Sequence, residues 1–113
     1  MTTQRTILAG FAALLMAAPA VAEEAISQDL AESRLRGCLL AGSSSTGQSQ
    51  LEAAVIQVRA YCGAQINRVR DMRVAVATKG LKGNAAEDAK TRAIRALNAE
   101  IAQAVANFSG LTL

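Results

Sequence analysis

Histidine and tryptophan are absent from this 113-residue chain, and aromatic side chains make up only 3% of it. Without an imidazole, the chain has no histidine base, no Ser-His or Cys-His nucleophile pair and no histidine ligand for a metal. The nine acidic residues are scattered and show no EF-hand spacing. The sequence therefore predicts a non-enzymatic protein that carries no cofactor and no metal.

Long apolar runs are also missing, except within the first 22 residues. This segment carries Arg5, continues with an apolar run over residues 7–18, and ends on small residues at Ala22, directly before Glu23. The pattern is typical of a secretory signal peptide that is cleaved between Ala22 and Glu23. The alternative is a retained membrane anchor, but the run is shorter than the roughly 20 residues that span a bilayer. We expect a protein of the periplasm or a secreted protein.

Excess charge is small once this leader is removed. Arg5 leaves with it, so the net charge of the predicted mature domain, residues 23–113, falls from +3 to +2. This bias is too weak to indicate nucleic acid as a partner. The apolar side chains that remain are mostly small, and small side chains bury little area each. A single domain of this size should be marginally stable, so a covalent cross-link would help it fold.

Cysteine occurs twice, at Cys38 and Cys62. In an oxidising compartment two cysteines allow one intramolecular disulfide, which we predict as the main structural cross-link. Free buried thiols, an intermolecular bridge and a redox pair are the alternatives. The redox reading lacks the Cys-x-x-Cys spacing that lowers a thiol pKa.

Helical periodicity and the scarcity of proline predict an all-α fold with three helices, at about residues 27–40, 49–78 and 85–108. Ser27 suits an N-cap, Gly37 interrupts the first helix, and the Gly/Ser-rich residues 42–49 form a linker. Asn84 and Glu87 resemble a capping box at the start of the third helix. The last two helices should form an antiparallel hairpin on which the short first helix docks.

Apolar residues at steps of three and four mark the buried faces of the two long helices. The second helix carries Leu51, Val55, Val58, Cys62, Ile66, Val69, Met72 and Val76. The third helix carries Ile94, Leu97, Ile101, Ala104 or Val105, and Phe108, and Gly110 should end it in a left-handed cap. Two exposed ion pairs are expected at i,i+4 spacing, Glu32 with Arg36 and Asp88 with Arg92.

Basic residues are concentrated at the end of the second predicted helix and in the turn after it. Arg59, Arg70 and Arg73 share one side of a continuous helix, and Lys79 and Lys82 follow in the turn. Such a patch could meet an anionic partner, namely lipid head groups, an acidic polysaccharide or an acidic protein. The alternative is that these cations only favour the negative end of a helix and solubility.

These patterns predict a small exported helical accessory or binding protein of the bacterial envelope. Its partner would be another protein, or a second copy bound through apolar helix faces. A basic module for a membrane surface or an anionic glycan is the alternative, and a thiol-redox protein is a further one.

Overall fold

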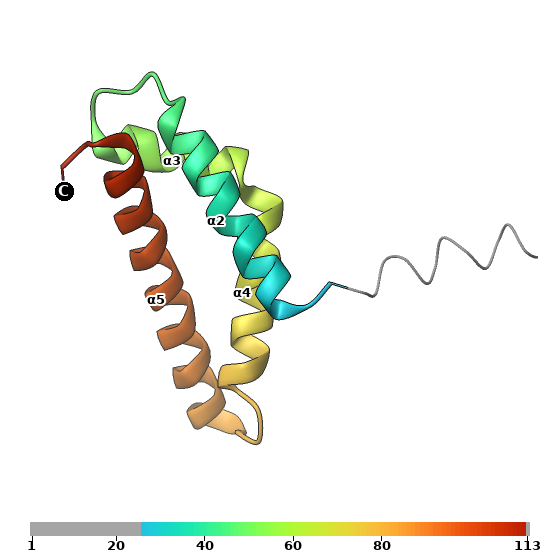
Figure 1. Cartoon of the computed structure of the whole chain (residues 1–113). Helices are drawn as coiled ribbons and strands as arrows, with labels where there is room; N and C mark the ends of the chain where they lie inside the picture. The colour runs from blue at the N-terminus through green and yellow to red at the C-terminus, as the bar shows by residue number, and fades with distance from the viewer. Residues whose placement is uncertain (1–25, 113) are drawn as a thin grey trace, which may run out of the picture.

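The computed structural model describes residues 26–112, which fold into four helices without a strand. They are α2 (Gln28–Ser44), α3 (Leu51–Tyr61), α4 (Gly63–Ala77) and α5 (Gly83–Ser109). Figure 1 shows α4 and α5 joined by a turn as an antiparallel hairpin, with α2 along the hairpin and α3 across its far end. The predicted all-α fold is confirmed. The predicted signal peptide and its cleavage site lie outside the described residues.

The first helix is longer than the sequence predicted. Its start is the predicted one, because the Ser27 hydroxyl accepts a hydrogen bond from the Leu30 N–H at 3.2 Å. However, α2 passes through Gly37 without a break and continues to Ser44, into the predicted linker. Packing explains the extension: Ser43 is buried, and Gly42 lies against Val58 and Tyr61. These tertiary contacts outweigh the low helix propensity of glycine and serine.

The second predicted helix is divided in two at Cys62, so the prediction of one helix over residues 49–78 is wrong. Cys62 has φ −100° and ψ 17°, although its N–H still donates to the Val58 carbonyl at 2.8 Å. Two causes meet there, since Cys62 is tied to Cys38 and the next residue, Gly63, has little helix propensity. The resulting bend lets α3 pack against both α2 and α5.

The turn between α4 and α5 is built from hydrogen bonds to the end of α4. The Thr78 hydroxyl donates to the Val74 carbonyl at 2.7 Å, and the Leu81 N–H donates to the Thr78 carbonyl at 2.9 Å. Gly80 and Gly83 adopt left-handed backbone angles, with φ of 76° and 59°. Helix α5 begins at Gly83, with Lys82 as its N-cap and no side-chain hydrogen bond at the cap. The predicted capping box of Asn84 and Glu87 is therefore wrong.

The opposite end of α5 is the predicted one. Gly110 adopts a left-handed φ of 77°, and its N–H donates to the Ala106 carbonyl at 3.0 Å. The side chain of Ser109 accepts the Leu111 N–H at 3.2 Å, and Leu111 packs against the core. This contact fixes the last residues of the described chain to the helix that they follow.

The core lies where α2, α3, α4 and α5 meet, and most of the predicted stripe residues are in it. Its least exposed large side chains include Val58, Val69, Ile101 and Val105. Val76 is an exception, because 63% of it is exposed. The end of the hairpin extends past the start of α2, so within residues 26–112 no third helix lies over this part of α4 (Figure 1). None of the helices in residues 26–112 combines the length and apolar content needed to cross a membrane.

Candidate functional site

The two cysteines lie at disulfide distance and join α2 to the bend between α3 and α4. Their sulfur atoms are 2.10 Å apart and their Cα atoms 5.9 Å apart, a separation that suits a disulfide. This geometry confirms the predicted pairing. Cys62 has no exposed surface, whereas Cys38 is only partly buried, so the Cys62 side of the bridge is closed to the direct attack that an exchange reaction requires.

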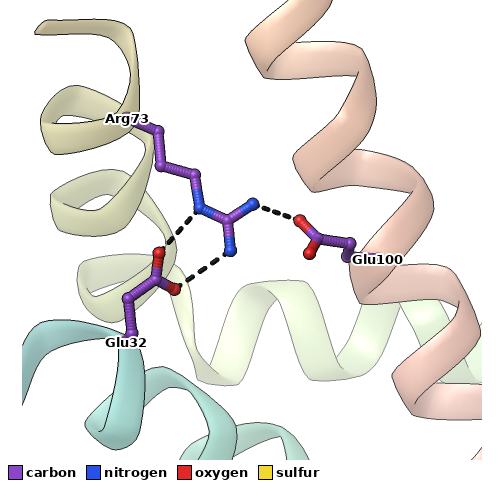
Figure 2. Close-up of polar contacts among 3 residues, drawn as sticks. All are labelled: Glu32, Arg73 and Glu100. Carbon is purple, nitrogen blue, oxygen red and sulfur yellow. Dashed lines mark hydrogen bonds and ion pairs between the residues drawn. The ribbon is translucent and has the colours of Figure 1, made fainter. Parts of the chain in front are cut away.

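A second link among the helices is a three-residue ion cluster, made by Glu32 of α2, Arg73 of α4 and Glu100 of α5. Figure 2 shows the Arg73 guanidinium between the two carboxylates. Its Nε and one terminal nitrogen donate to the two oxygens of Glu32, at 2.7 and 3.0 Å, and the other terminal nitrogen donates to Glu100. A bidentate fork of this kind fixes orientation as well as distance. The cluster therefore links α2, α4 and α5 at one point, in addition to their core packing.

The ion cluster shifts the pKa values of Glu32 and Arg73. The hydrogen bonds from Arg73 lower the pKa of Glu32, desolvation opposes this effect, and the charges of Arg73 and Arg36 add to the lowering. The hydrogen bond to Glu32 is also the largest cause that raises the pKa of Arg73. Glu32 thus meets Arg36 only through its charge, and the predicted Glu32–Arg36 ion pair is wrong.

The other predicted pair is not formed either. Asp88 and Arg92 make no ion pair among the described residues, where the ion pairs join Arg70 to Asp71 and Arg73 to its two carboxylates. Both side chains of the predicted pair are exposed. Solvent screening makes such a contact worth little, so its absence costs α5 almost nothing.

A groove of about 310 Å³ runs between α2 and α5, beside this cluster. Its floor is apolar and is made by Leu35, Leu39, Leu97, Ile101, Ala104 and Phe108. Its rim is polar and is made by Glu32, Arg36, Arg73, Glu100, Gln103 and Asn107. An apolar floor with a few polar groups around it is the usual composition of a binding site. This groove is the candidate functional site.

The structure divides the basic patch that the sequence suggested. Arg59 lies on α3 and donates to the Asn98 side chain of α5 at 3.1 Å, and Arg70 binds its neighbour Asp71 at 3.2 Å. Arg73 is held inside the ion cluster. Lys79 and Lys82 are both exposed in the turn between α4 and α5. The prediction that Arg59, Arg70 and Arg73 share one side assumed a single straight helix, without the bend at Cys62.

The partners of Arg73 are the main site residues that the sequence did not reveal. Glu32 is 41 positions away from Arg73 along the chain, and Glu100 is 27 positions away. No local spacing encodes contacts over such separations. The only available signal was that opposite charges occur on different helices, with arginines on the second predicted helix and carboxylates on the first and third.

Comparison with known proteins gives no relative. No protein family model, no curated protein and no solved structure matches this chain. Within residues 26–112, metal-binding side chains nowhere gather in groups of three or more. The groove and its two cross-links must therefore be interpreted from their own chemistry.

Acid should weaken the ion cluster, and Glu32→Gln should reveal it. Because the folded-state pKa of Glu32 is lowered, its contribution to stability is present above the unfolded-state pKa and is lost as the pH falls through the folded-state pKa. Urea unfolding between about pH 5 and about pH 3 should show a steep fall in stability for the wild type and a shallower one for Glu32→Gln. Glu52→Gln, at an exposed first-turn position of α3, should keep the wild-type slope. Equal slopes for all three proteins would contradict the assignment.

Proposed function

We propose that this protein is a small exported accessory or binding protein of the bacterial envelope, without enzymatic activity, which holds a segment of a protein partner in the groove between α2 and α5. The observation that carries the proposal is the groove itself, with an apolar floor on α2 and α5 and a polar rim to which α4 adds Arg73. Sites built on helices that are fixed in place are better ordered than sites on loops.

Two links between helices, the disulfide and the ion cluster, support a groove that exists before the partner binds. The disulfide attaches α2 near its C-terminal half, and the ion cluster attaches the same helix near its start through Glu32. The α2 residues that line the groove, Glu32, Leu35, Arg36 and Leu39, lie at or close to these two points. A partner that binds a preformed groove does not have to order it first, which favours affinity.

The size of the groove favours side chains over a large cofactor. Sites for small molecules and cofactors span about 300–1,000 Å³, and this groove lies at the lower end of that range. The rim offers both signs of charge together with amide groups. These features suit an amphipathic peptide segment that places one or two apolar side chains on the floor.

Export is proposed from the leader and agrees with the cysteine pair. The first 22 residues have the features of a cleaved signal peptide, and disulfides persist in oxidising compartments such as the periplasm. A thiol-redox function is disfavoured by the burial of Cys62. The absence of histidine from the whole chain supports binding over catalysis.

Site-specific photo-crosslinking in the envelope tests this proposal. A photoreactive side chain is placed at Ala104, which lines the groove, or at Ala99, which is exposed elsewhere on the same helix. We expect Ala104 to give a discrete protein adduct and Ala99 to give none. The mass of the exported protein, measured in the same preparation, should correspond to a chain that starts at Glu23.

A blocking variant serves as the second arm of this experiment. Ala104→Trp should fill the groove and weaken adduct formation from a probe at Gln103 by at least about ten-fold, which corresponds to the loss of one well-packed contact. Ala99→Trp adds the same side chain outside the groove and should leave the adduct unchanged. Identical adducts from the probes at Ala104 and Ala99 would overturn the proposal. So would an uncleaved chain that keeps its first 22 residues.

A further inference from the structure

Two large apolar side chains are exposed at the end of the α4–α5 hairpin. Val76 lies in the last turn of α4 and is 63% exposed, and Leu81 lies in the connecting turn and is 42% exposed. They flank a tight turn that is closed by the hydrogen bond from the Leu81 N–H to the Thr78 carbonyl. Among the helices of residues 26–112, only α4 and α5 reach this end (Figure 1), so Val76 and Leu81 lie on a part of the hairpin that extends beyond α2 and α3. We name residues 76–82 the hairpin tip.

The hairpin tip is positively charged and has no carboxylate of its own. Lys79 and Lys82 are both exposed there. Between positions 72 and 86 the chain has no acidic residue, and the nearest acid on α4, Asp71, is bound by Arg70. The nearest acids on α5, Glu87 and Asp88, come one turn into that helix, and neither lysine forms an ion pair within residues 26–112.

The start of α5 adds to this positive character. Lys82 occupies the N-cap position without a side-chain hydrogen bond, and the first turn contains no acidic residue. The free N–H groups of a helix N-terminus carry a partial positive charge. The start of α5 thus directly follows Lys82 in the chain, and its partial positive charge adds to the charge of the two lysines.

We propose that the hairpin tip docks on an anionic lipid surface. Val76 and Leu81 enter the interfacial region of the bilayer, and Lys79 and Lys82 contact the phosphate groups around them. Charge complementarity supports a lipid surface as the occupant, because anionic lipids attract clusters of lysine. The position at the end of the hairpin supports it too, since exposed apolar side chains on a projecting turn can reach a flat surface that a recessed groove cannot. This docking is independent of the groove between α2 and α5.

A free phosphate or an acidic protein would use the hairpin tip differently. Either could be held by the lysines alone, and neither requires the exposed apolar pair. Binding to a lipid surface uses both the lysines and the apolar pair, because apolar burial and electrostatic attraction together determine how strongly an interfacial segment binds. The test therefore measures the charged and the apolar contributions separately.

The experiment uses the full exported chain with its disulfide intact and vesicles of equal parts phosphatidylglycerol and phosphatidylcholine. We expect sedimentation with these vesicles at low salt and none with pure phosphatidylcholine. Lys79→Glu combined with Lys82→Glu should weaken partitioning by at least about 25-fold, since each lysine near an anionic surface contributes about five-fold. Arg34→Glu combined with Arg68→Glu gives the same change of net charge at exposed positions away from the turn and should weaken it far less.

The absence of tryptophan from the chain provides a clean probe of insertion. Leu81→Trp should shift its fluorescence to the blue on anionic vesicles, whereas Ile56→Trp, at a 70% exposed position of α3, should not. Equal losses in the two charge-reversed variants would reduce the effect to net charge and overturn the proposal. So would an unshifted Leu81→Trp spectrum, or complete competition by soluble glycerol phosphate, which would identify a free anion as the ligand. These outcomes leave the groove proposal unaffected, because its cross-linking test does not involve the hairpin tip.

Discussion

Replacement of both cysteines by alanine is expected to lower the free energy of unfolding by about 3.5 kcal/mol. The bridge closes a loop across 24 positions of sequence, and the chain-entropy model assigns roughly this value to a loop of that length. A domain of this size has few stabilising contacts to lose. We therefore expect the double variant to be largely unfolded at moderate temperature, as measured by urea or thermal unfolding followed by circular dichroism.

The wild-type protein in the presence of a reductant is the control for this measurement. Cys62 is completely buried, so its replacement by alanine also removes sulfur from the core. If the cross-link is the main cause, the reduced wild type and the double alanine variant should lose similar amounts. An unfolding midpoint that does not move on reduction would show that the bridge is not a structural cross-link.

Arg73→Met is expected to have the second largest effect and to destabilise the domain by about 1.5–3 kcal/mol, the usual worth of hydrogen bonds to charged groups. Methionine preserves the length of the side chain but leaves Glu32, whose side chain is 25% exposed, without its partner. Most of the cost should come from Glu32, since the Glu100 side chain is 59% exposed and can be solvated by water. Chemical denaturation at neutral pH measures this cost.

Arg70→Met is the matched control on the same helix. Arg70 pairs with its neighbour Asp71, and their side chains are 41% and 72% exposed. Its replacement should change stability by less than about 0.5 kcal/mol, as for other exposed pairs. Arg73→Lys should lie between the two, because lysine keeps the charge but loses the fork that binds both oxygens of Glu32. Equal effects of Arg70→Met and Arg73→Met would contradict a special role for the cluster.

The sequence predicted the end of a helix correctly where a single residue determines it. Ser27 caps α2 and Gly110 ends α5 because each feature needs only a hydroxyl or a left-handed residue at one position. The apolar stripes likewise predicted which faces are buried. Periodicity is a property of a single helix, so one sequence contains enough information to reveal it.

The remaining features depend on contacts between distant segments. The bend at Cys62 arises where a cross-link and Gly63 coincide, and the helical pattern on either side gives no sign of it. The extension of α2 to Ser44 depends on the packing of Gly42 against α3. The groove also requires the relative placement of α2 and α5. That placement depends on core packing between residues far apart in the sequence and on the contacts of Arg73 with Glu32 and Glu100.

The position of the disulfide also affects how the protein would tolerate proteolysis. The exposed segment between α2 and α3, residues 45–50, is rich in the small polar residues that proteases favour in loops. It lies inside the covalent loop from Cys38 to Cys62. A single cut there would therefore leave α2 bonded to the rest of the domain, and both walls of the groove would stay together in a chain that had already been cleaved.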